Sequence, residues 1–171
     1  MGDNASEGDA YFRLGNTYYN LRDFKNALEC HNLHLGIVRE MSNKGGENVA
    51  YCNLGNAYHS LGSFKEAIEY YNLYLNIAKE MGDKATEGDA YCRLGNTYYN
   101  LRKFNKATEY HNLHLGFLRE MNDKVGEGNA YCNLGNAYHS LGSFEEATEY
   151  YNLYLNIAKE MGDKASEGDA Y

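Results

Sequence analysis

Asparagine recurs at one position of a 40-residue period, and this row of carboxamides is the strongest functional signal in the sequence. A carboxamide both donates and accepts hydrogen bonds, so it can pair with the N–H and C=O groups of a peptide. Packed helices lie about 8–10 Å apart, and an extended peptide rises about 3.3 Å per residue. One asparagine per repeat would therefore meet about every third residue of a bound peptide. The alternative is that each asparagine bonds a neighbouring helix and only stabilises stacking. The row consists of Asn16, Asn56, Asn96 and Asn136.

Other polar residues share the predicted helix face of the asparagines. Arg13 and Arg93 could bind a ligand carboxylate, because a guanidinium pairs with it through two parallel hydrogen bonds. Asp9 and Asp89 precede them by four residues, so each arginine could equally be neutralised by its own aspartate. The sequence leaves both interpretations open. The complete set of candidate peptide-binding residues is Asn16, Asn56, Asn96, Asn136, Arg13, Asn53, Arg93, Asn133, Asn20 and Asn100.

The cysteines are expected to be small packing or groove residues. Cys52, Cys92 and Cys132 occupy one repeat position and are separated by a full repeat. Neither a disulfide nor a zinc site tolerates that separation.

Two pairs of histidines could suggest a metal site, but the alignment of the repeats argues against it. His31 and His34 align with Tyr71 and Tyr74, on the predicted packing surface of a helix. No Ser/His/Asp set, phosphate-binding loop or pair of catalytic carboxylates stands out either. We therefore predict that the chain is not an enzyme and that it needs no metal or other cofactor. The two histidine motifs are Cys30-His31-x-x-His34 and His111-x-x-His114.

The candidate residues lie in an internal sequence repeat, so the fold of that repeat must position them. The string Leu-Gly-Asn-x-Tyr starts at Leu14, Leu54, Leu94 and Leu134, and residues 1–80 share 63 of 80 identities with residues 81–160. The unit is therefore a pair of repeats, in the order A-B-A-B. Four periods are followed by an 11-residue segment that nearly copies the first 11 residues. The sequence looks like a window cut from a longer array, or like a designed array.

Each period is predicted to form two helices of about 16 residues that are joined by turns of two to four residues. Apolar residues at helical spacing define one buried stripe on each helix. The first stripe contains Tyr11, Leu14, Tyr18 and Leu21. The stripe of the second helix contains Phe64, Ala67, Ile68, Tyr71, Leu75 and Ala78.

Residues suited to helix ends stand between these stripes. Gly62 and Gly142 are expected to end first helices in the left-handed conformation. Arg22 and Arg102 hold the same position in the other two repeats, where the stop should be weaker. The segment from Ser63 to Glu66 reads as a capping box, as does the segment from Ser143 to Glu146. Gly82 and Gly162 should end second helices, and Asp83 and Asp163 should cap the next ones.

The pattern of Tyr11, Leu14, Gly15, Tyr18, Phe24, Ala27 and His31 resembles the tetratricopeptide repeat (TPR) family. Tyr11 stands where that family usually has tryptophan, and Gly15 and Ala27 would be the small residues where two helices touch. The 40-residue period and the absence of proline suggest a longer second helix, as in arrays of the Partner of Inscuteable type.

The resemblance implies an all-α protein, an α-α superhelix of four helix-turn-helix repeats plus a partial fifth. The expected domain is a single TPR array over residues 1–171. Its repeats would cover about 8–47, 48–87, 88–127 and 128–167, with a truncated fifth to residue 171.

The same resemblance places the first helices on a concave groove and implies a scaffold or adaptor that binds an extended peptide through the asparagines. Asn16, Asn53 and Arg93 match the clamp with which some TPR domains bind the acidic C-termini of chaperones. Phe12 and Asp89 stand where that clamp has lysines, and Asp89 would repel a carboxylate, so we reject the clamp. The alternative function is structural: a module that self-associates head to tail by stacking its ends.

Composition excludes several other classes of function. With 24 acidic against 16 basic residues and a net charge of −8, a nucleic acid or an anionic membrane is not the expected partner. No apolar run approaches the 18 residues of a membrane-spanning helix, and the polar N-terminus does not read as a signal peptide. We expect a cytoplasmic protein that binds a protein or peptide ligand.

Overall fold

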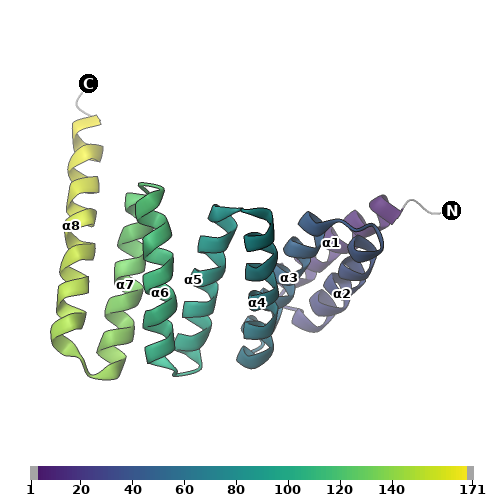
Figure 1. Cartoon of the computed structure of the whole chain (residues 1–171), viewed down its shortest axis with the longest axis horizontal. Helices are drawn as coiled ribbons and strands as arrows, with labels where there is room; N and C mark the ends of the chain where they lie inside the picture. Colours follow the sequence, from purple (N-terminus) through teal and green to yellow (C-terminus); the bar gives the residue numbers. More distant parts are fainter. Residues whose placement is uncertain (1–3, 169–171) are drawn as a thin grey trace. The chain divides into compact units, whose positions relative to one another are not determined.

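The computed structural model describes residues 4–168, and their side chains as far as residue 162. This range forms eight α-helices and no strand (Figure 1). Contacts divide the chain into two compact units, one up to Ala90 and one from Tyr91 onward, so the fifth helix begins in the first unit and ends in the second. The helices are α1 (Asn4–Asn20), α2 (Phe24–Glu40), α3 (Lys44–Ser60), α4 (Phe64–Met81), α5 (Lys84–Asn100), α6 (Phe104–Glu120), α7 (Lys124–Leu141) and α8 (Phe144–Gly168).

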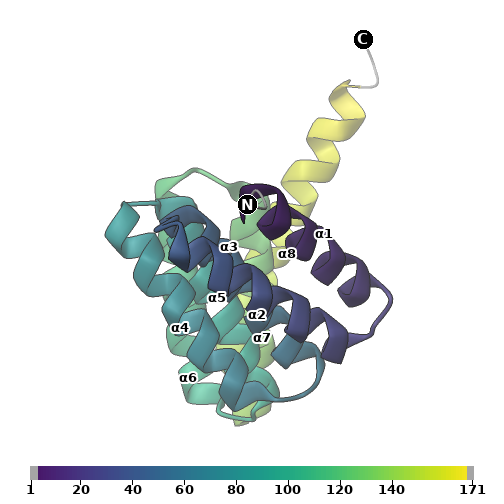
Figure 2. The same ribbon diagram turned by 90° about the vertical axis from the view of Figure 1, so that its right-hand side faces the viewer.

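The predicted pairs of helices are confirmed, and the fold is all-α. In the first unit α1 packs on α2, α2 on α3, and α3 on α4; Figure 2 shows α1 beside α2. In the second unit α6 packs on α7 and α7 on α8, side by side in Figure 1. Short turns of about three residues join the helices, which leaves each pair antiparallel.

Carboxylate and carboxamide side chains cap the helix starts. Asp23, Asn43 and Asp123 each accept a hydrogen bond from the backbone N–H three residues later, and Asp83 does the same with Thr86 N–H at 3.0 Å, as predicted. The capping box expected at Ser63 is wrong, because Ser63 stands at the N-cap without a side-chain cap bond. Its ψ of 64° is lower than the 72° to 89° of the three residues that do cap, and its hydroxyl reaches less far than an aspartate oxygen.

The first helices end in the left-handed conformation in all four repeats. Gly62 and Gly142 have φ of +77° and +79°, as predicted. Arg22 and Arg102 adopt the same region with φ of +60° and +57°, although a side chain makes it costly. The closing bond is the same in both cases, for example from Asp23 N–H to the Tyr18 carbonyl at 2.9 Å. With arginine, α1 and α5 end at the same repeat position as α3 does with glycine, and α7 ends one residue later.

The second helices of the second and fourth repeats end differently. Gly82 ends α4 with φ of +69°, as predicted. The corresponding prediction for Gly162 and Asp163 is wrong, because α8 continues to Gly168. No following helix packs on α8 within the described residues, so the chain keeps its backbone hydrogen bonds by continuing the helix.

The buried stripes are confirmed with two exceptions on the first helices. Leu54, Leu94 and Leu134 are completely buried, whereas Leu14 is 44% exposed because no described helix precedes α1. The placement of Leu21 in the stripe is wrong, since it is 71% exposed. Leu21 follows the last residue of α1, and the turn carries its side chain away from the helix interface. In the predicted second-helix stripe, Ala67, Tyr71, Leu75 and Ala78 are buried, whereas Phe64 and Ile68 are half-buried.

Candidate functional site

All ten candidate residues reach the surface of the first helices at least in part. The four asparagines of the row are half-buried in the first unit and exposed in the second. Of the remaining six, Arg13, Asn20 and Asn100 are exposed, whereas Asn53, Arg93 and Asn133 are half-buried.

A tyrosine hydroxyl orients the asparagine in the second and fourth repeats. Tyr71 donates a hydrogen bond to Oδ1 of Asn56 at 2.8 Å, and Tyr151 does the same to Asn136 at 2.8 Å. The amide nitrogen of Asn56 lies 3.8 Å from Sγ of Cys52, which is a weak acceptor. With Oδ1 engaged, the amide presents chiefly its N–H donors, so the bond to a neighbouring helix that the sequence left open does exist at these two positions.

A histidine replaces that tyrosine in the first and third repeats. The ring of His31 lies over Gly15, where an added Cβ would come within 2.6 Å of the ring. His31 is 1% exposed and its Nδ1 has no hydrogen-bond partner. Burial, with His34 nearby as the smaller cause, lowers the pKa of His31 to about 4, so the ring is neutral at pH 7. His111 over Gly95 repeats this arrangement, including a pKa lowered to about 4 by burial. These histidines fill the helix interface, as the repeat alignment predicts.

Arg13 forms the local pair that the sequence left open. Its Nε donates to Oδ2 of Asp9 at 2.7 Å, and both side chains are more than half exposed. This hydrogen bond is the main cause that raises the pKa of Arg13. At the equivalent position Asp89 accepts a hydrogen bond from the Tyr74 hydroxyl at 3.0 Å. Arg13 would therefore have to exchange its aspartate for a ligand carboxylate.

Hydrogen bonds join neighbouring first helices within each unit. The hydroxyls of Tyr19 on α1 and Ser60 on α3 lie 2.9 Å apart. Those of Tyr99 on α5 and Ser140 on α7 lie 3.1 Å apart. The candidate face is thus continuous from one repeat to the next inside a unit. Sequence analysis missed this pairing, which has its only sequence signal in the 41-residue separation.

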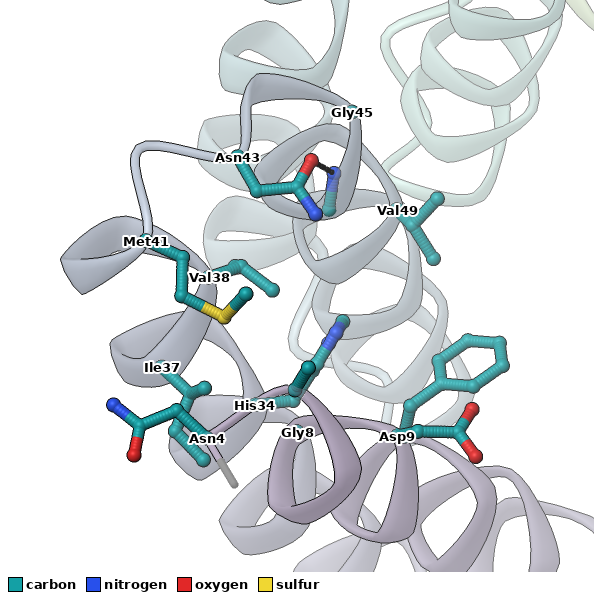
Figure 3. Close-up of a pocket in the computed structure, with 13 residues that line it drawn as sticks. Asn4, Gly8, Asp9, His34, Ile37, Val38, Met41, Asn43, Gly45 and Val49 are labelled. Atoms are coloured by element: carbon teal, nitrogen blue, oxygen red, sulfur yellow. Dashed lines mark hydrogen bonds between the residues drawn. The ribbon is translucent and has the colours of Figure 1, made fainter. Parts of the chain in front are cut away.

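A pocket of about 320 Å³ opens between α1, α2 and α3 (Figure 3). Phe12, Ile37, Val38, Met41 and Val49 supply apolar walls. Gly8 of α1 and Gly45 and Gly46 of α3 also line it. Sequence analysis missed this pocket, since its lining comes from three helices and from positions outside the asparagine row.

Cysteine and histidine do not gather into a metal site in the described part of the chain. No group there combines three or more His, Cys, Asp or Glu residues in a suitable arrangement. All four cysteines are free, and Cys30 is buried. Among the described helices none is long and apolar enough to cross a membrane.

Comparison with known families decides what this fold is. Residues 6–80 and 82–160 match the sequence profile of the family described as tetratricopeptide repeat. The chain belongs to the TPR family. A repeat scaffold of the TPR type indicates a role in protein–protein interaction. A search of curated proteins finds no match for the chain.

Solved structures show the same TPR architecture at low sequence identity. BtubC from P. vanneervenii superposes with a TM-score of 0.87 at 22% identity, over 95% of this chain and 67% of that protein. The apo form of RapI gives a TM-score of 0.85 at 17% identity, over 99% of this chain and 62% of RapI. A Rap protein complexed with competence and sporulation factor gives 0.79 at 17%, over 96% of this chain and 46% of that one. The chain thus spans only part of these three proteins, and the likeness shows the fold alone.

Proposed function

We propose that this TPR protein is an interaction scaffold that holds an extended peptide segment of a partner against its first helices. The row of asparagines would bind the backbone of the peptide. We also propose that the scaffold is not an enzyme, that it resides in the cytoplasm and that its net charge of −8 disfavours nucleic acid as a partner.

The orientation of Asn56 and Asn136 carries this proposal. Both amides reach the surface of a first helix and have Oδ1 held by a tyrosine hydroxyl at 2.8 Å. Their amide nitrogens lie 3.8 and 3.9 Å from a thiol, which is a weak acceptor. A peptide carbonyl would be a better acceptor. Fixing the amide beforehand also reduces the entropy lost when the peptide binds.

The asparagines of the first and third repeats would bind less strongly. Tyrosine is replaced there by a buried histidine whose Nδ1 has no partner, so no hydroxyl orients Asn16 or Asn96. Asn96 keeps the contact of its amide with Cys92 at 3.7 Å. We therefore rank Asn56 and Asn136 above Asn16 and Asn96 as contributors to affinity.

Selection from a random 12-residue peptide library, followed by affinity measurements on the selected peptides, tests the proposal. Asn56→Ala with Asn136→Ala should weaken binding about tenfold or more, because each lost hydrogen bond is worth about 0.5–1.5 kcal/mol. The matched control is Asn76→Ala with Asn156→Ala, which changes two exposed asparagines on second helices and should leave affinity unchanged. Equal affinity of the two double variants would rule out the asparagine ladder.

A second pair of substitutions tests the orienting role of the hydroxyls. Tyr71→Phe with Tyr151→Phe keeps both rings over Gly55 and Gly135 and removes only the bonds to the amides. We expect a loss of affinity smaller than that of the asparagine double variant. Affinity equal to that of the parent protein would show that the orientation does not contribute to binding.

Self-association is the second candidate function, and the exposure of α8 favours it. Leu155 is 47% exposed, whereas the equivalent Leu75 on α4 is 6% exposed. Tyr154 is 40% exposed, and its equivalent Tyr74 donates to Asp89 at 3.0 Å. The face of α1 on a second copy offers the matching aspartate, Asp9.

Sedimentation over a concentration series tests head-to-tail stacking of this chain. Stacking predicts oligomers that grow with concentration, and Leu155→Asp should abolish them by placing a charge on the exposed face of α8. A chain that stays monomeric up to high concentration would exclude this candidate.

A further inference from the structure

We propose that the pocket between α1, α2 and α3 receives one uncharged aliphatic or aromatic side chain of the bound peptide and so gives sequence preference to a scaffold that otherwise grips the backbone. This inference rests on the proposed function, and it names the class of peptide side chain that the pocket selects.

The shape of the pocket suits a single apolar group. Its volume of about 320 Å³ lies at the lower end of the range for small-ligand sites. In Figure 3, Val38 and Met41, at the end of α2 and just after it, lie on one side of His34, and Val49 from α3 lies on the other. His34 is 7% exposed, and burial lowers its pKa, so it adds no positive charge at pH 7.

The two near-identical halves of the sequence differ most at this pocket. Seven of its 13 lining positions differ from their equivalents 80 residues later, against ten of the other 67 positions of the half. Gly45 corresponds to Val125, which adds a branched side chain. Ile37 corresponds to Phe117, whose ring lies 5.6 Å from that of Tyr91. These two smaller residues open the space in the first unit.

The remaining differences make the pocket apolar and neutral. Phe12 replaces the cysteine of the equivalent position and Val49 replaces an asparagine. Asn4 and Asn43 replace a lysine and an aspartate, and Asn43 still caps α3 by accepting from Gly46 N–H at 2.9 Å. The one carboxylate of the lining belongs to Asp9 and is paired with Arg13. Each change thus favours an uncharged occupant over a charged one.

The pocket adjoins the proposed backbone-binding residues. On α1, Phe12 lies about one turn before Asn16 and Asp9 about two turns before it. On α3, Val49 precedes Asn53 by four residues and so lies on the same helix face. A peptide backbone bound to Asn16 and Asn56 would pass the mouth of the pocket within reach of a side chain.

Titration of the ¹⁵N-labelled chain with blocked amino-acid amides tests the pocket without a known ligand. We expect N-acetyl-leucinamide and N-acetyl-phenylalaninamide to shift the backbone amide signals of Gly8, Gly46 and Val49, and N-acetyl-lysinamide to leave them unchanged. Gly45→Val with Val49→Asn should abolish these shifts, because it installs the residues of the second half, which the same fold already accommodates. Equal shifts with the lysine amide would overturn the proposal.

The same double variant tests the link to peptide binding. Peptides selected from the 12-residue library should share an apolar residue at one position, and Gly45→Val with Val49→Asn should weaken them about ten- to a hundredfold. The matched control, Val125→Gly with Asn129→Val, should not weaken them. Unchanged affinity of the pocket variant, together with the loss caused by Asn56→Ala and Asn136→Ala, would overturn the pocket and leave the proposed function standing. Amides that bind while the library yields no peptide would overturn both the pocket's role and the peptide scaffold.

Discussion

The two kinds of repeat fill the space over the same glycine with different rings. In the second repeat Tyr71 lies over Gly55 and its hydroxyl reaches Asn56 at 2.8 Å. In the first repeat His31 lies over Gly15, and its Nδ1 is buried without a partner. The fourth and third repeats reproduce these two arrangements in the second unit.

The difference shows how the position of a polar atom on a ring decides what burial costs. A phenol carries its oxygen at the far end of the ring, so the ring can be buried while the hydroxyl still finds a partner. An imidazole carries both nitrogens in the ring, so burying the ring also desolvates a nitrogen. Repeats with tyrosine therefore gain an oriented asparagine, and repeats with histidine gain a titratable group in their core.

Low pH should destabilise the first and third repeats, which contain His31 and His111, more than the other two. This loss in the free energy of unfolding is the largest effect that we expect. His31 and His111 have pKa values near 4 in the folded chain, against 6.5 for an ordinary histidine. The unfolded chain therefore binds more protons between pH 6.5 and 4, and stability falls as the pH falls through that window. By pH 4 the loss should reach about 3 kcal/mol for each histidine, measurable by urea unfolding with circular dichroism at several pH values.

His31→Tyr with His111→Tyr places a tyrosine over the glycine in all four repeats. The double variant separates the protonation of these histidines from the titration of carboxylates. The double variant should lose markedly less stability than the parent between pH 6.5 and 4. A parallel pH dependence of the two proteins would show that these histidines are not buried in neutral form.

Adding a methyl group over the glycine should destabilise both kinds of repeat. In Gly55→Ala the new Cβ would lie 2.5 Å from the ring of Tyr71, which is 3% exposed and cannot move aside. We expect a loss of about 2 kcal/mol in the free energy of unfolding, because overpacking outweighs the better helix propensity of alanine. Gly36→Ala is the control, since nothing lies within 4 Å of its added Cβ, and it should stabilise the chain by up to about 1 kcal/mol. Similar stabilities for the two variants would contradict the close contact.

The smallest effect is expected in the turn between the two helices of a repeat. Arg22 has φ of +60° in a histidine repeat where the tyrosine repeat has Gly62 at φ of +77°. Arg22→Gly should stabilise the chain by about 1 kcal/mol, because glycine adopts this region without steric cost. Gly62→Arg should cost a similar amount. If denaturant unfolding found both changes neutral, the strain at Arg22 would be negligible.

Much of the fold could be read from the sequence because it depends on contacts between residues close along the chain. The period of 40 predicted the helix pairs, and Gly62, Gly82, Gly142 and Asp83 correctly predicted the ends at which they stand. The predictions failed where the local signal was incomplete. Ser63 makes no capping bond, Leu21 turns into solvent, and Gly162 does not stop α8, because each outcome depends on backbone geometry or on a neighbouring helix.

For the candidate site, too, the sequence predicted one part and tertiary contacts decided another. Helical periodicity alone placed the asparagines at the surface of the first helices. The sequence could not show that Tyr71 orients Asn56, since the two residues are 15 positions apart on different helices.

Sequence by itself thus determined the repeat, the all-α class and the residues that face outward, because periodicity is a property of each helix alone. Tertiary structure decided which polar atoms are satisfied and where an apolar pocket opens. Gly45, Ile37 and Val49 differ from the second half by ordinary substitutions, and only the packing of three helices turns those differences into a space of about 320 Å³. The volume left between helices depends on side chains that meet from separate elements, and no single stretch of sequence contains that information.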